Sequence, residues 1–223
     1  MRTPRTLARV TGVLYLLVAV FTGFAGVVNT SVVVEGDAAA TADNIRASAG
    51  LYRLGFVSEL VGAVAFLLTG MALYLLLRHV DRFVAAALVV FVAVGVALQT
   101  LNLLNQKTAL TLAVGGADAG SDRLTALFAE MQRDGYLIAQ TYFGLWLLPL
   151  GYLVLKSDYF PRPLGVLLMA GCCGHLVDVF GRFLAPGFGA AVSPFALAAA
   201  AVAELSFIGW LLIKAVPGSP VPD

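Results

Sequence analysis

The stretch "FVAAALVVFVAVGVALQTLNLL", residues 83–104, decides the fold class. It contains no charged residue, and it is as long as the run of about 20 apolar residues with which an α-helix crosses a hydrocarbon core of about 30 Å. It also lacks the regular alternation of apolar and polar residues that marks a strand of a membrane β-barrel. Because backbone polar groups inside lipid must be paired within the segment, the stretch predicts a transmembrane helix.

The rest of the chain has the same character. Hydrophobic residues make up 60% of the sequence and charged residues 12%, against roughly 25% charged residues in soluble proteins. The mean hydropathy is +0.92. The sequence therefore predicts an all-α fold: a polytopic membrane protein with a six-transmembrane-helix bundle. The expected spans are residues 8–28, 51–77, 83–104, 135–155, 164–184 and 194–215.

One domain is expected, because no soluble domain or internal repeat interrupts the spans. Residues 1–216 are predicted to form a single six-helix transmembrane domain. Residues 217–223, at the end of "VPGSPVPD", are predicted to form a disordered C-terminal tail, since they are short, polar and rich in proline.

The second outer loop carries an amphipathic pattern. Its apolar residues Leu124, Leu127, Phe128 and Met131 recur at helical spacing, and Ser121 precedes them as a suitable N-cap. This pattern predicts a short amphipathic helix in the second outer loop, either resting at the lipid interface or covering a pocket.

Basic residues near the span ends predict the orientation, because cytoplasmic loops are enriched in Lys and Arg. The inner loops "RHVDR" and "KSDYFPRP" are also short, which gives their charges more weight. We therefore expect both the N- and the C-terminus on the cytoplasmic side. On this orientation eight basic residues lie inside (Arg2, Arg5, Arg9, Arg78, Arg82, Lys156, Arg162, Lys214) and six outside (Arg46, Arg53, Lys107, Arg123, Arg133, Arg182).

Composition argues against several classes of function. The net charge is +1 and the basic residues are scattered singly, so nucleic-acid binding is not expected. The only two cysteines, Cys172 and Cys173, are adjacent, which offers neither a disulfide framework nor a zinc-finger spacing. His175 is the one histidine inside a span, whereas catalytic zinc usually has two or three His or Cys ligands. No metal site and no cofactor are assigned.

Polar residues inside the spans are the candidates for function. A charged group at the bilayer centre costs roughly 2.5–3.5 kcal/mol on insertion scales, so it requires a partner or water. Counting about 1.5 Å per residue from the loops places polar groups of five spans at overlapping depths. This convergence predicts a polar cavity that faces outward. The candidate cavity or ligand-binding residues are Glu59, Gln99, Asn102, Gln140, His175, Asp178 and Glu204.

Two arginines, Arg53 and Arg182, are the candidates for the mouth of this cavity. Near the outer boundary their long side chains can extend to water as anchors. If they lean inward instead, they would pair with Glu59 and Asp178 and favour an anionic headgroup or solute. The sequence leaves both arrangements open.

Four segments resemble one known family. They are "NIRASAGLYRLGFVSEL" (44–60), "NLLNQ" (102–106), "GYLIAQTYFGLWLLPLGYLVLKS" (135–157) and "FPRPLGVLLMAGCCGHLVD" (160–178). They resemble the bacterial membrane proteins grouped as domain of unknown function 4386. The resemblance spans nearly the whole chain and implies a six-helix bacterial membrane protein whose biochemical role is not established. We expect a multi-pass protein of the bacterial cytoplasmic (inner) membrane. It implies no catalytic or binding residue.

Three functions stay compatible with the pattern. Ionisable groups within spans favour binding or transport of a small molecule, ion or lipid headgroup in the outward-facing cavity. One alternative is an intramembrane enzyme, including a metal-dependent hydrolase that would use His175 with the carboxylates. The other is a structural or sensory subunit whose buried ionic network fixes the helix register. Membrane lipids are the expected partners, a small-molecule or lipid ligand goes with the first function, and homo-oligomerisation is left open.

Overall fold

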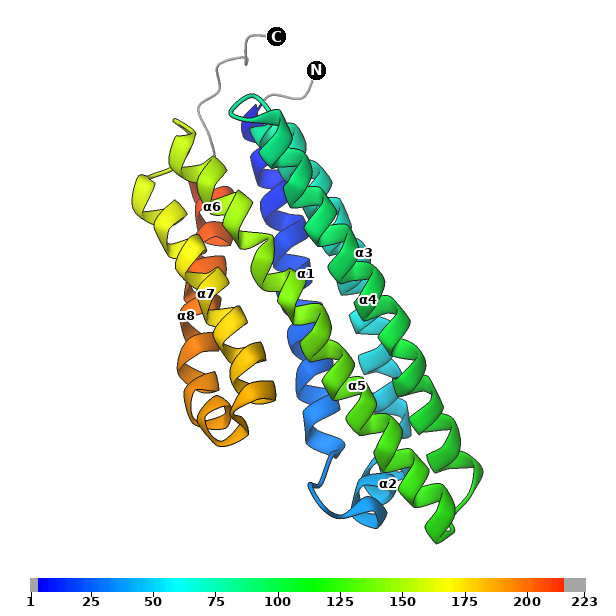
Figure 1. Ribbon diagram of the computed structural model, residues 1–223. Helices are drawn as coiled ribbons and strands as arrows, with labels where there is room; N and C mark the ends of the chain where they lie inside the picture. Colours follow the sequence, from blue (N-terminus) through cyan, green and yellow to red (C-terminus); the bar gives the residue numbers. More distant parts are fainter. Residues whose placement is uncertain (1–3, 215–223) are drawn as a thin grey trace. The chain divides into compact units, whose positions relative to one another are not determined.

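The computed structural model describes residues 4–214, and these hold eight α-helices without a β-strand (Figure 1). The predicted C-terminal tail, residues 217–223, lies outside the described residues. The helices are α1 (Pro4–Val32), α2 (Ala38–Ala47), α3 (Ala49–Leu77), α4 (Arg82–Gly115), α5 (Ala119–Leu145), α6 (Leu147–Lys156), α7 (Arg162–Leu184) and α8 (Pro186–Ile213).

Six stretches of the described chain are helical, long and apolar enough to cross a membrane. They are α1, α3, α4, the combined stretch Ala119–Lys156 of α5 and α6, α7 and α8. This confirms the predicted all-α fold with six spans. Several helices run further than predicted, and α4 continues to Gly115 instead of ending at 104. Hydropathy shows which part of a helix is apolar. It does not show where the helix ends, because polar side chains such as Gln106 also occur within helices.

The second loop differs from the prediction. Leu124 and Met131 belong to the first half of α5, which continues without a break to Leu145. The prediction of a separate short amphipathic helix is therefore wrong. The prediction that Ser121 is the N-cap is wrong as well. Asp118 caps this helix, and its Oδ1 accepts hydrogen bonds from the backbone N–H groups of Gly120 at 3.0 Å and Ser121 at 3.1 Å.

A short helix lies in the first loop instead, where none was predicted. Gly36, at φ 78°, takes the left-handed conformation that glycine tolerates best. Asp37 then caps α2 by accepting a hydrogen bond from the backbone N–H of Ala40 at 2.9 Å. Thus α2 is capped at its start, and its inner face joins a small core made of Val28, Val32, Ile45, Tyr52, Ala109, Ala113 and Ala129.

The chain divides into two compact units. The first unit comprises Met1–Leu16, Ala65–Val96 and Ile138–Asp223, and the second comprises Leu17–Val64 and Ala97–Leu137. The helices α1, α3, α4 and α5 each contribute residues to both units. The expectation of a single domain over residues 1–216 stays a prediction.

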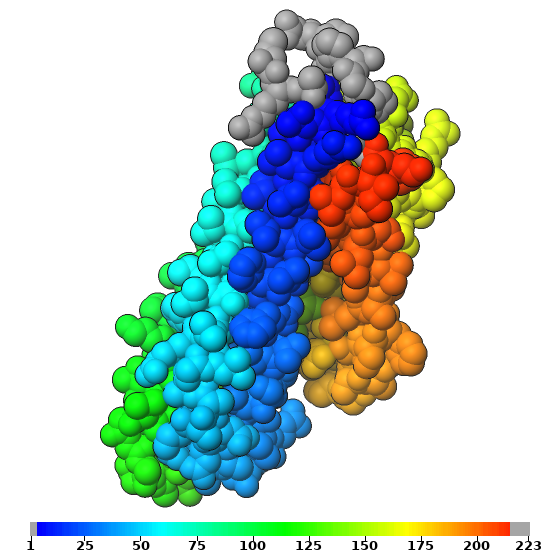
Figure 2. All heavy atoms as spheres, turned by 180° about the vertical axis from the view of Figure 1, so that it is seen from behind, coloured from blue at the N-terminus to red at the C-terminus, as the bar shows by residue number. Residues whose placement is uncertain are grey.

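In the first unit, α7 and α8 lie side by side as a helical hairpin (Figure 1). A side chain at Gly151 of α6 or at Gly165 of α7 would place its Cβ 2.7 Å from the other residue's carbonyl oxygen, so both positions need glycine for this close approach. Figure 2 shows α8, in orange and red, with its side chains on the surface. Phe195, Val202 and Leu205 are among its exposed apolar residues, as expected of a helix that faces lipid.

Candidate functional site

In the first unit, three polar side chains from three helices meet at one carboxylate. The hydroxyl of Tyr15 on α1 donates a hydrogen bond to Oε2 of Glu204 on α8. The Nε2 atom of His175 on α7 lies 3.1 Å from Oε1 of the same carboxylate. We call Tyr15, His175 and Glu204 the histidine cluster. The structure therefore brings together two of the predicted site residues and adds Tyr15.

The hydrogen bonds of the histidine cluster define where its protons lie. An ionised carboxylate only accepts hydrogen bonds, so Nε2 of His175 carries a proton when it bonds to ionised Glu204. In the neutral imidazole the other nitrogen, Nδ1, is then a bare acceptor. Nδ1 is buried and has no hydrogen-bond partner in the described part of the chain. The cluster thus presents one unused acceptor beside a carboxylate.

Small and aromatic residues position the histidine cluster. Gly144 on α5 makes room for His175, because a Cβ atom at this glycine would lie 2.7 Å from the Cβ of His175. On the other side, the ring of Tyr15 packs edge-on against Trp146, with ring centroids 5.3 Å apart, and contacts Phe207 at 6.4 Å. These contacts restrain the phenol that donates to Glu204.

A second network in the first unit is centred on Asp178, which is 1% exposed. Its Oδ2 accepts a hydrogen bond from Nε2 of Gln140 at 2.8 Å, and its Oδ1 accepts one from Nε of Arg182, also at 2.8 Å. Arg182 further donates to Oγ of Ser193 on α8 at 2.6 Å. Both carboxylate oxygens are satisfied, and the network ties α5, α7 and α8 together. Arg182 thus takes the inward-leaning arrangement of the two left open.

In the second unit, Glu59 on α3 is 2% exposed and is held by neutral amides. Asn29 on α1 donates to its Oε2 at 3.2 Å, and Gln99 on α4 donates to its Oε1 at 3.5 Å. Gln106 continues the chain of amides by donating to Oδ1 of Asn29 at 2.9 Å. Within residues 4–214 no Lys, Arg or His forms an ion pair with Glu59. Arg53, which would pair with Glu59 in the inward-leaning arrangement, is exposed.

Asn102, also in the second unit, joins α4 to α5. Its Nδ2 donates to the backbone carbonyl of Gln132 at 2.7 Å, and its Oδ1 accepts a hydrogen bond from Asn105 at 2.9 Å. A Cβ atom at Gly135 would clash with the Asn102 amide, so glycine at 135 is what admits this side chain. Through its hydrogen bond to Gln132, Asn102 links α4 to α5.

The structure thus divides the predicted residues between the two units. Glu59, Gln99 and Asn102 belong to the second unit, whereas Gln140, His175, Asp178 and Glu204 belong to the first. The single outward-facing cavity that was expected to join all seven stays a prediction. Tyr15, Asn29, Gln106 and Ser193 were not among the candidates; the first three carry polar side chains at helical spacing on apolar spans, which is the signal that marks them. In the described ranges, no three His, Cys, Asp or Glu side chains are grouped so that they could hold a metal ion.

Six long apolar helices with ionisable groups held between them define a multi-pass membrane protein. Comparison with known families agrees: the chain belongs to the family described as "Domain of unknown function (DUF4386)", which matches residues 10–215. An uncharacterized protein of Archaeoglobus fulgidus is 29% identical over 143 residues, which cover 64% of this chain and 72% of the relative. No solved structure matches. The resemblance noted from the sequence is confirmed, and it brings no specific activity.

Proposed function

We propose that this protein binds a small positively charged solute at the histidine cluster and passes it across the membrane. The observation that carries the proposal is the arrangement around Glu204: its carboxylate accepts from Tyr15 and His175, and the adjacent Nδ1 of His175 is buried without a partner. Both hydrogen bonds come from groups that are neutral when His175 is unprotonated. The cluster then carries a net charge of −1.

A cation is the ligand that this chemistry favours. An uncompensated carboxylate inside a span is costly, and a bound cation or proton removes the charge. A ligand with an N–H group would in addition find an acceptor in Nδ1. The cluster is therefore suited to hold a solute cation.

The orientation belongs to the same proposal. We propose that the N- and C-termini lie on the cytoplasmic side of the inner membrane and that the polar groups are accessible from the outside. The short inner connections between α3 and α4 and between α6 and α7, with their basic residues, support this orientation. The proposal also requires that water from the outside reaches the polar halves of the spans.

Thermal unfolding of the purified protein tests the ligand class. The protein is heated with methylated ammonium or guanidinium salts, against sodium chloride at equal ionic strength. A ligand present at about 100 times its Kd stabilises the folded state by about 2.7 kcal/mol, so a binding cation raises the unfolding temperature. The rise should vanish in Glu204→Gln and persist in the control Glu35→Gln, whose carboxylate is 86% exposed. Equal rises in all three proteins, or none in wild type, would rule out the histidine cluster as the site.

Chemical labelling tests access from the outside. In a background in which Cys172 and Cys173 are replaced by alanine, Gln140→Cys should react with a membrane-impermeant maleimide added to intact cells. Val89→Cys, in the apolar part of α4, serves as the control and should not react. Protection of Gln140→Cys to the level of Val89→Cys would contradict an outward-facing wet cavity.

A further inference from the structure

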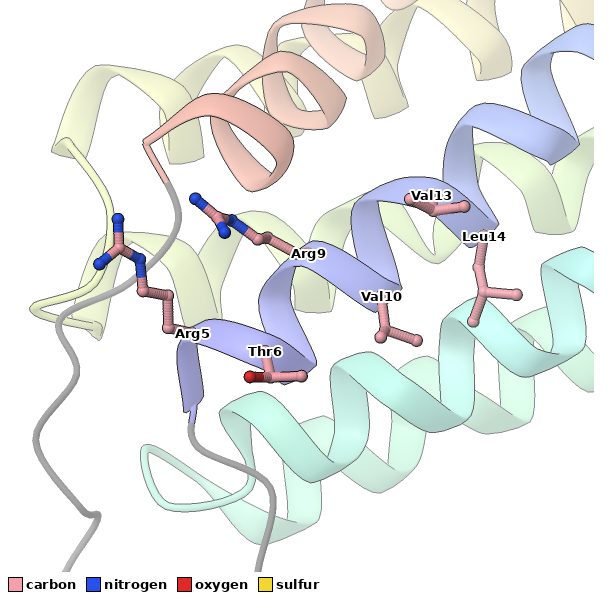
Figure 3. Close-up of a pocket in the computed structure, with 6 residues that line it drawn as sticks. All are labelled: Arg5, Thr6, Arg9, Val10, Val13 and Leu14. Atoms are coloured by element: carbon pink, nitrogen blue, oxygen red, sulfur yellow. The ribbon is translucent and has the colours of Figure 1, made fainter.

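A hollow lies beside the first turns of α1 (Figure 3). Its volume is about 420 Å³, and all of its described lining residues belong to the first unit. It combines a polar end with an apolar side. The lining residues are Arg5, Thr6, Arg9, Val10, Val13 and Leu14.

The polar end is formed by two arginines that have no partner among residues 4–214. Arg5 and Arg9 are four residues apart, so they lie one above the other on the same face of the helix. Figure 3 shows both guanidinium groups extending to the same side of α1. Both side chains are exposed, and neither forms a hydrogen bond or ion pair within the described residues. Their positive charge is thus available to a ligand.

The chemistry of two adjacent guanidinium groups selects an anion with several oxygens. Each guanidinium presents its N–H groups in a planar fork that matches the oxygens of a phosphate, and such charge-assisted hydrogen bonds are among the strongest in proteins. Two forks one helical turn apart can contact one phosphate group or two linked ones. The polar end of the hollow therefore fits a phosphate ester.

The apolar side indicates where that phosphate comes from. Val10, Val13 and Leu14 follow the arginines along α1, and Val13 is 51% exposed. The two arginines occupy the first two turns of a candidate span, so the apolar residues continue into the hydrocarbon region. A ligand that fills both ends has a phosphate attached to a hydrocarbon chain. A soluble phosphate would leave the apolar side uncovered.

We propose that Arg5 and Arg9 bind the phosphate of an anionic phospholipid whose acyl chain lies along Val10, Val13 and Leu14. Basic residues beside a span attract anionic lipids of the cytoplasmic leaflet, which is where the expected orientation places this end of α1. The site uses none of the residues of the histidine cluster. It shares with the proposed function only the orientation of α1, and its test measures bound lipid and not transport.

Lipid extraction from the purified protein is the direct test. Wild type, the double variant Arg5→Gln/Arg9→Gln and the control Arg123→Gln are purified in the same uncharged detergent, and the bound phosphatidylglycerol is counted by mass spectrometry. Arg123 is a matched control, because it is also exposed and forms no ion pair in the described chain. The double variant should retain about tenfold less phosphatidylglycerol than wild type, as expected for the loss of charge-assisted hydrogen bonds. The control should match wild type.

A second variant and a soluble ligand complete the test. Arg5→Lys/Arg9→Lys keeps the charge that guides membrane insertion but lacks the planar forks, so its retention should fall between wild type and the glutamine variant. Added phosphatidylglycerol should raise the unfolding temperature of wild type, whereas glycerol 3-phosphate at equal concentration should not. Equal lipid retention in wild type and both double variants overturns the proposal. Equal stabilisation by glycerol 3-phosphate overturns the lipid as the source of the phosphate.

Discussion

His175 and Glu204 share a hydrogen bond across two helices, with Nε2 and Oε1 3.1 Å apart. The two residues are 29 positions apart in sequence, and the α7–α8 hairpin brings them together. If the bond holds them as a coupled pair, the losses in unfolding free energy from His175→Ala and Glu204→Gln should not add. A double-mutant cycle by thermal unfolding in one detergent should give a coupling of about 0.5–3 kcal/mol. Additive losses would mean that the two groups act independently.

The ion pair between Asp178 and Arg182 predicts an asymmetry. Asp178 is buried, whereas the side chain of Arg182 is 40% exposed. Replacing Arg182 with methionine strands a buried carboxylate, and removing one partner of a buried pair costs about 3–5 kcal/mol. Replacing Asp178 with asparagine leaves an arginine that can extend to water, so the loss should be smaller. Urea or thermal unfolding of both variants measures the difference, and an equal or reversed order would contradict this account.

The fold could be predicted because the membrane imposes one simple requirement. A span must be apolar over about 20 residues, and this is visible in the sequence without knowledge of tertiary contacts. The ends of α4 and α5 were less predictable. The C-terminal half of α4 and the N-terminal half of α5 combine polar and apolar residues, and hydropathy does not distinguish such a helix from a loop. The cap that begins α5 also depends on which of Asp118 and Ser121 reaches the backbone, which local sequence leaves undecided.

The residues of the candidate site could be predicted from the sequence, whereas the partners of these residues could not. Polarity within a span is enough to single out Glu59, Asp178 and Glu204. Which groups they contact depends on how each helix is rotated, so Tyr15 and Ser193 were missed as partners of Glu204 and Arg182. Counting depth from the loops also gave Glu59 and Glu204 similar positions, although they belong to different units.

The close approach of α6 and α7 predicts which glycines are essential. At Gly151 and Gly165 a Cβ atom would lie 2.7 Å from a carbonyl oxygen of the facing helix. Gly151→Ala should therefore destabilise the protein by about 1–3 kcal/mol, the usual cost of overpacking. Gly209→Ala on α8 is the matched control, because nothing lies within 4 Å of the added atom. It should be neutral or stabilising by up to about 1 kcal/mol, since alanine favours the helix. Similar unfolding temperatures for the two variants would contradict the packing seen here.

The proposed orientation predicts the outcome of reporter fusions. A phosphatase that is active only outside the cytoplasm should be active when fused after Gly116, in the turn between α4 and α5, and inactive when fused after Lys214. In this proposal the even number of candidate spans puts both termini on one side, and the basic residues of the inner loops favour the cytoplasm for that side. A fusion after Val80, between α3 and α4, provides a second inner position and should also be inactive. Activity after Lys214 would reverse the orientation and remove the outward-facing cavity.

We expect replacement of the Glu59 carboxylate by an amide to affect stability in the opposite way to the same change at Asp178, although both carboxylates are buried. Asp178 is paired with Arg182, so Asp178→Asn removes an attraction that the structure uses. Glu59 has only two amide donors at 3.2 and 3.5 Å and no cationic partner among the described residues. Glu59→Gln therefore removes a group that is costly to keep charged, while the amide can still bond to Asn29 and Gln99 after either of them rotates. The unfolding free energy of Glu59→Gln should stay within about 1 kcal/mol of wild type or rise, as expected when a buried charge is replaced by a neutral group of the same shape.

Glu59→Ala is the second measurement, because it leaves Asn29 and Gln99 without an acceptor and should cost about 1–3 kcal/mol. If Glu59→Gln destabilises the protein as much as Asp178→Asn does, the charge of Glu59 is compensated in the folded protein, and its environment differs from the neutral one described here.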